Sequence, residues 1–150
     1  MPQLRYLLPC LALILVAGAR AGDADAQSKD APVKVAGTYD SKFDAVANNC
    51  SKVGMSFASA RVELSQPKER SVSVTIPSVP YMNGVVSRGG KFRAVAKRGK
   101  TAIKGVDGRF SVAGRVEKGA IQFLFIAEYF EGQKPLCTQS WNASGPRIRD

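Results

Sequence analysis

The chain of 150 residues contains no histidine. Because Ser-His-Asp and Cys-His catalytic groups, histidine general bases and most zinc sites depend on imidazole, the sequence offers none of these chemistries. Cysteines number only three, and the twelve carboxylates are scattered, without the paired arrangement that glycoside hydrolysis needs. We therefore predict a protein that is not an enzyme and that binds no metal and no cofactor.

The sequence has little continuous hydrophobicity. Its apolar run LLPCLALILV (residues 7–16) is shorter than the roughly 20 residues of a membrane-spanning helix. The run follows Arg5 and precedes the small-residue stretches GARA and GDADA, an order typical of a secretory signal peptide, with an uncleaved anchor as the alternative. We expect a signal peptide at residues 1–21, with cleavage after Ala21 or Ala26, and a flexible leader at 22–34.

The rest of the chain, residues 35–148, is expected to be one secreted β domain, periplasmic or extracellular and without a transmembrane segment. Removal of the signal peptide takes Cys10 with it. In an oxidising compartment Cys50 and Cys137 are predicted to form a disulfide, with two free thiols or a metal-binding pair as the alternatives.

Short alternating segments separated by turn residues dominate from Arg61 onward. In residues 91–97 the alternation places Phe92 and the two following alanines inward, and in 109–116 it places Phe110, Val112 and Val116 inward. Asp107-Gly108 is a strong hairpin signal. The pattern predicts a mainly β fold, an antiparallel meander that closes into a small barrel or a sandwich.

The segment at residues 120–130 is apolar on both sides, which is typical of a strand covered on both faces. Its one carboxylate, Glu128, is either a buried acid or the partner of a neighbouring Arg or Lys. Apolar residues recur at helical spacing near residues 42–53, and Ser41 with Asp44 resembles a capping box. We predict one short helix there, with a loop as the alternative, lying over the outer face of the 120–130 strand.

Positive charge is the most distinctive feature of the chain. The sequence has 22 Lys and Arg against 12 Asp and Glu. Ten of these cations but only two acids fall within residues 88–118. A surface of one sign repels itself, so we predict an anionic partner, with a simple solvated face as the alternative. The predicted anion-binding residues are Arg88, Lys91, Arg93, Lys97, Arg98, Lys100, Arg109 and Arg115.

The stretch AVAKRGKT (residues 94–101) is close to a phosphate loop. A true phosphate loop needs a glycine where Ala94 stands, and its lysine and threonine must open a helix. Here Lys100 and Thr101 precede residues that read as strand and turn, so no nucleotide is predicted as a partner. Aromatic residues for base stacking are also sparse among the cations. The expected partner is therefore an envelope polyanion, an anionic lipid headgroup or an acidic protein.

Two alternative functions stay open. Gly37-Thr38-Tyr39 and Arg147 faintly resemble the G-x-W motif and the closing arginine of lipocalins, with tyrosine in place of tryptophan. This resemblance covers only a few residues, and it implies a barrel that carries a small hydrophobic ligand. Phe110, Phe123 and Phe125 would line the apolar pocket, and a filled core is the alternative. The second alternative is an inhibitor or accessory subunit of another secreted protein, for which the sequence offers no discriminating residue.

Overall fold

The computed structural model describes residues 32–150, so the predicted signal peptide lies outside the described part. Every regular element within these residues is a β-strand. The described part of the chain contains no helix long and apolar enough to cross a membrane. The strands are β1 (Gly37–Asn48), β2 (Ser59–Lys68), β3 (Ser71–Thr75), β4 (Met82–Val86), β5 (Lys91–Val95), β6 (Gly99–Lys100), β7 (Val106–Glu117), β8 (Ala120–Glu131) and β9 (Lys134–Arg149).

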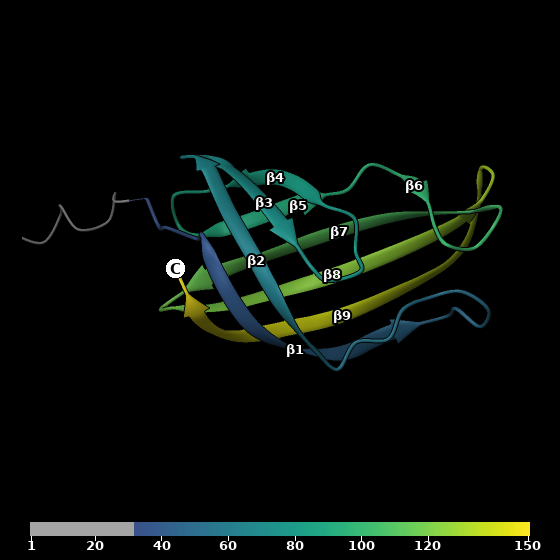
Figure 1. Ribbon diagram of the computed structural model, residues 1–150, viewed down its shortest axis with the longest axis horizontal. Coiled ribbons are helices and arrows are strands. Elements are labelled where there is room, and N and C mark those ends of the chain that lie inside the picture. The colour runs from purple at the N-terminus through teal and green to yellow at the C-terminus, as the bar shows by residue number, and fades with distance from the viewer. Residues whose placement is uncertain (1–31) are drawn as a thin grey trace, which may run out of the picture.

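Eight of the described strands form a closed antiparallel ring in which neighbours in the chain are neighbours in space (Figure 1). The ring runs from β1 through β5, continues with β7, β8 and β9, and returns to β1. Its closing contact joins β5 to β7, from Lys91 opposite Arg115 to Val95 opposite Ser111. Short β6 pairs with β7 beyond the end of β5. The predicted antiparallel meander is confirmed, as one continuous sheet and not the two separate sheets of a sandwich.

Apolar side chains at alternate positions of the strands fill the inside of the ring. On β8 the odd-numbered residues from Ile121 to Tyr129 are buried, whereas Leu124 and Ile126 on the outer face are half-buried. Aromatic rings occupy the middle: Phe125 stacks on Trp141 with centroids 5.4 Å apart, and Phe43 meets Phe123 edge to face at 5.9 Å. Such pairs add about 0.5–1.5 kcal/mol each beyond the burial of apolar area.

The short helix predicted near residues 42–53 does not form. Residues 37–48 are instead strand β1, which is hydrogen-bonded to β2 on one side and to β9 on the other. Phe43 points inward, whereas Val46, which the helical spacing placed on an apolar face, is 56% exposed. The ladder with β2 ends at Lys42, so pairing with β9, which continues to Asn48, is what outweighs the weak local preference for helix. The outer face of β8 consequently has no helix over it.

The predicted disulfide between Cys50 and Cys137 is present, and it closes a loop of 87 positions. It ties the segment that follows β1 to the first part of β9, where Cys137 is buried.

Hydrogen bonds also join the last strand, β9, to β1 and to the residues before it. Arg147 on β9 donates hydrogen bonds to the Tyr39 hydroxyl (Nη2 to Oη, 2.9 Å) and to the backbone oxygen of Lys34 (2.8 Å). The Tyr39 hydroxyl in turn donates to the backbone oxygen of Val35 (2.7 Å). Burial raises the pKa of Tyr39, and the Arg147 guanidinium partly opposes this effect.

Gly37 makes this contact possible. Its φ of +149° favours glycine, and a Cβ there would lie 3.0 Å from Arg147 Nε and 2.8 Å from the backbone oxygen of Arg149. The residues of the lipocalin resemblance, Gly37, Tyr39 and Arg147, therefore meet at one place in this fold.

Replacing both cysteines by serine (C50S/C137S) is expected to lower the free energy of unfolding by about 4–5 kcal/mol, because the long loop is no longer restrained in the unfolded chain. Urea unfolding monitored by Trp141 fluorescence measures the change. Unmodified protein in reductant is the control and should match the variant, and equal stability with and without the disulfide would contradict the expectation.

Arg147→Met is expected to lower the free energy of unfolding by about 2 kcal/mol, because it removes charge-assisted hydrogen bonds and leaves the buried Tyr39 hydroxyl with fewer partners. Arg149→Met is the matched control: it lies on the same strand end, is exposed and should change stability by less than about 0.5 kcal/mol. Equal losses in the two variants would argue against the contact.

Candidate functional site

The eight predicted anion-binding residues do not form one surface. In the described part of the chain, four of them make ion pairs with nearby carboxylates: Arg88, Arg98, Arg109 and Arg115. The other four have no carboxylate of the described residues within 4.0 Å: Lys91, Arg93, Lys97 and Lys100. This division separates the cations that neutralise the protein's own acids from those available to a partner.

Arg109 and Arg98 belong to the first kind. Arg109 makes a bidentate pair with Glu128 across β7 and β8, with nitrogen–oxygen distances of 2.8 and 2.9 Å, and the hydrogen bonds raise the pKa of Arg109. Arg98 lies 3.3 Å from Asp107, donates to the backbone oxygen of Gly132 and stacks 4.1 Å from the centroid of Phe130. Both guanidinium groups therefore bind acceptors within the fold, although the buried Nε of Arg98 has no hydrogen-bond partner among the described residues. Glu128 is the partner of a neighbouring strand's arginine.

The remaining ion pairs are weak. Arg88 lies 3.8 Å from Glu69, and Arg115 lies 3.4 Å from Glu117, with all four side chains more than half exposed. Exposed pairs of this kind contribute about 0–1 kcal/mol. An anionic partner can compete for Arg115 at little cost.

Lys91 and Arg115 stand directly opposite each other where β5 meets β7, and both are exposed. Arg93, two residues further along β5, lies between Val85 of β4 and Ala113 of β7. Like charges directly across a strand pair destabilise a sheet. The ring therefore closes with repulsion between cations on its outer face.

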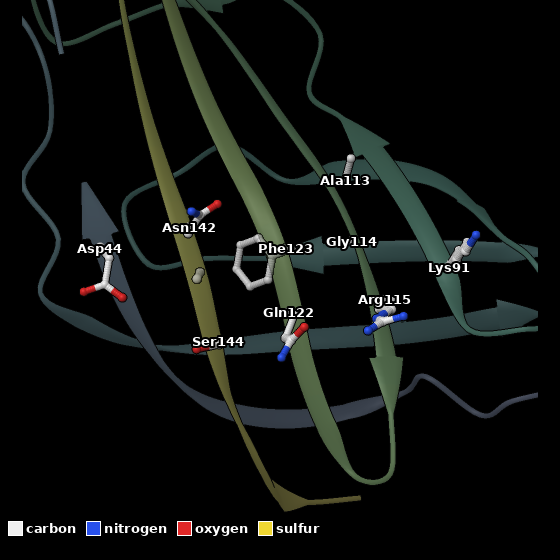
Figure 2. Close-up of a pocket in the computed structure, with 10 residues that line it drawn as sticks. Asp44, Lys91, Ala113, Gly114, Arg115, Gln122, Phe123, Asn142 and Ser144 are labelled. Carbon is white, nitrogen blue, oxygen red and sulfur yellow. The ribbon is translucent and has the colours of Figure 1, made fainter. Parts of the chain in front are cut away.

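Two open hollows lie at this place on the outer face. One, of about 490 Å³, crosses β5, β7, β8, β9 and β1, and Figure 2 shows Lys91 and Asp44 on opposite sides of it with Arg115 and Gln122 between. The other, of about 510 Å³, crosses β4, β5 and β7 and reaches the turn before β3. The two share the residues Lys91, Ala113 and Gly114, and we call them together the basic groove.

A small residue on the outer face gives the basic groove its depth: Ala113 is exposed but ends at Cβ. Gly114, the next residue, lies at an inward position opposite Phe92 and Phe123. A Cβ on Gly114 would lie 2.1 Å from the backbone oxygen of Gln122 and 2.4 Å from Phe123 Cβ, so β7 and β8 approach each other closely only because this residue is glycine. The floor is thus set by the backbone of β7 and not by mobile side chains.

Four cationic side chains and one carboxylate line the basic groove. Arg70, Lys91 and Arg93 line the hollow over β4, Lys91 and Arg115 line the other, and Asp44 lies at its far side. Neutral hydrogen-bonding groups complete the lining: Ser87, Gln122, Asn142 and Ser144. This set can hold an anion and donate to hydroxyl or carbonyl oxygens. No group of three or more acids or cysteines within residues 32–150 could hold a metal ion.

The sequence reasoning missed Arg70. The residue lies in the turn between β2 and β3, outside the basic stretch at residues 88–118. It reaches the groove because β3 pairs with β4, and β4 with β5. Strand order would have been needed to find it. Conversely, Lys97 and Lys100 lie outside the groove.

Within residues 32–150, aromatic side chains pack at the place named for a hydrophobic ligand. Phe123 and Phe125 pack in the central aromatic cluster, where Phe125 also stacks on Phe110 at 6.4 Å. Phe110 lines a pocket at one end of the ring, and Phe123 contributes to one hollow of the basic groove. The stretch that is close to a phosphate loop forms β6 at Gly99 and Lys100, followed by a loop at Thr101.

Comparisons of the chain with known protein families, with curated proteins and with solved structures returned no match. The site is therefore interpreted from its own geometry.

Proposed function

We propose that this chain is an exported, non-catalytic binding protein that holds an anionic polysaccharide in the basic groove. The observation that carries the proposal is the placement of Lys91 directly opposite Arg115 over a preformed hollow, with Arg93 and Arg70 beside it. Neither Lys91, Arg93 nor Arg70 has a carboxylate of the described residues within 4.0 Å. An anion bound between them relieves a repulsion that the exposed Arg115–Glu117 pair offsets only weakly.

The shape and lining of the groove favour a polysaccharide among the polyanions. The groove is open and crosses several strands, so it suits an extended polymer and not a single enclosed group. Amide and hydroxyl side chains such as Gln122, Asn142 and Ser144 match the hydroxyl groups of sugars. Val85, 53% exposed, offers an apolar contact beside Arg93. The only aromatic residues in the lining, Phe92 and Phe123, are buried and cannot stack on bases.

Export fits the disulfide, because disulfides persist in oxidising compartments and are rare in the cytosol. The residue order at 1–26 supports the same proposal. In the periplasm or outside the cell, acidic polysaccharides are accessible to such a protein.

Removing two groove cations (K91Q/R93Q) is expected to weaken binding to soluble heparin by roughly tenfold to thirtyfold, at about 1 kcal/mol for each cation near an anionic surface. The matched control K104Q/K134Q removes the same charge from exposed positions outside the groove and should weaken binding by less than about threefold. Isothermal titration at about 0.1 M salt measures both. Equal weakening in the two variants would show that only net charge matters, and the proposal would fail.

The choice of polymer is tested with the unmodified protein. Binding to polygalacturonate that is lost in K91Q/R93Q supports a polysaccharide ligand. Binding to phosphatidylglycerol vesicles or to poly-glutamate, with no binding to either polysaccharide, would instead indicate a lipid surface or an acidic protein.

Filling the hollow without changing its charge is a second test. Ala113→Trp places a large side chain on the shared floor and is expected to weaken binding to short heparin oligosaccharides by about tenfold, because the anion is held further from Lys91 and Arg93. Val95→Trp is the control, since Val95 is on the same outer face, is 50% exposed and lines neither hollow. Unchanged affinity of Ala113→Trp would exclude the hollow as the binding site.

A further inference from the structure

A second, separate pocket is lined in part by Lys100 of β6 and by Tyr129 near the end of β8. Figure 1 shows β6 and the turn between β8 and β9 at one end of the ring, away from the C-terminus. Its volume is about 310 Å³, at the lower end of the usual range for small-molecule sites. The pocket shares no residue with the basic groove. Its lining comprises Gly54, Met55, Ser78, Pro80, Lys100, Thr101, Ala102, Ile103, Phe110 and Tyr129. We call it the end pocket.

Tyr129 contributes to the inner wall of the end pocket, and its buried hydroxyl group has no partner among the described residues. Phe110 and Tyr129 are both 4% exposed, and their rings meet edge to face at 6.2 Å. The Tyr129 hydroxyl is buried and has no hydrogen-bond partner among the described residues. A buried polar group without a partner costs about 1–3 kcal/mol, so a phenylalanine would suit a purely structural role better.

The hydroxyl stays neutral at physiological pH, because burial raises the pKa of Tyr129. It therefore offers one donor and two acceptor sites. The nearest cation of the lining, Lys100, lies on β6 and is exposed at the rim. The lining thus combines apolar side chains with the unpartnered Tyr129 hydroxyl, and Ser78 and Thr101 add two further hydroxyl groups.

The walls of the end pocket are held in place by hydrogen bonds. Buried Gln139 accepts from the backbone NH of Met55 (2.8 Å) and donates to its backbone oxygen (3.2 Å). On the other side, the Thr101 hydroxyl donates to the backbone oxygen of Val106 (2.9 Å) and accepts from the backbone NH of Ile103 (3.2 Å). A pocket whose walls are already ordered loses little conformational entropy when it binds.

We infer that the end pocket binds a small, mainly apolar molecule, about one aromatic ring in size, that carries an oxygen atom to hydrogen-bond the Tyr129 hydroxyl. The volume limits the size, and the side chains of Met55, Ile103 and Phe110 require an apolar body. The unpartnered hydroxyl requires the oxygen. This site does not depend on the basic groove or on its polysaccharide.

The test uses the full mature chain and two probes that differ by one oxygen, 4-methylphenol and toluene. Amide chemical shifts followed during titration are expected to move saturably at Met55, Ile103 and Tyr129, with 4-methylphenol bound about fivefold more tightly than toluene. Tyr129→Phe should abolish that preference while leaving toluene affinity within about twofold. Tyr81→Phe, which removes an exposed hydroxyl outside the pocket, should leave both affinities unchanged.

Two results would overturn the inference. One is the absence of saturable shifts at the end pocket with either probe, whether or not shifts occur in the basic groove. The other is a preference for 4-methylphenol that survives in Tyr129→Phe. Thermal unfolding is the control for correct folding of the variant. Tyr129→Phe should be at least as stable as the unmodified protein, because the hydroxyl that it removes has no internal partner. Ile103→Lys, at an exposed wall position, is a second variant and should weaken both probes by more than fivefold.

Discussion

Hydrogen bonding between β5 and β7 closes the sheet, and the other features of the molecule depend on this pairing. Closure satisfies both edges of the ring and creates one inner face that apolar side chains fill. The same register sets Lys91 opposite Arg115 on the outer face. The contact that completes the fold is therefore also the place where cations repel each other. Stability alone would favour a neutral or opposite-charge pair at that position, which is why we interpret it as a binding feature.

A similar conflict marks the end pocket. Tyr129 continues the inward alternation of β8, and its ring packs well against Phe110. Its hydroxyl, however, has no internal partner, whereas the hydroxyl of Tyr39 on the same inner face meets both Arg147 and the backbone of Val35. Two tyrosines in one core thus differ in what surrounds the oxygen. The Tyr39 hydroxyl, which has partners, lies at the contact between β1 and the last residues of β9. Tyr129, whose hydroxyl has none, lines a pocket.

Sequence patterns predicted the parts of this structure that depend on alternation within a strand. Phe92 and Ala94 point inward and Lys91 and Arg93 outward, as expected. The antiparallel meander and the Cys50–Cys137 disulfide were also predicted, but several features that depend on the order and register of the strands were missed. Asp107-Gly108 was predicted to turn the chain, but Gly108 pairs with both Gly99 and Tyr129, and the turn comes earlier, where the backbone NH of Val106 bonds to Ile103. The helix near residues 42–53 and the omission of Arg70 have the same origin, because only the order of strands around the ring decides them.

The segment between β1 and β2 takes its conformation from β9. Three inward residues of β9 hold it by different means: Cys137 through the disulfide to Cys50, Gln139 through two hydrogen bonds to Met55, and Trp141 through edge-to-face contact with Phe57 at 5.5 Å. Alternation puts these three side chains on one side of one strand. The disulfide is therefore more than a restraint on the unfolded chain. It is the first of three anchors along a segment whose residues Gly54 and Met55 line the end pocket, so the covalent link and the shape of that pocket belong to one arrangement.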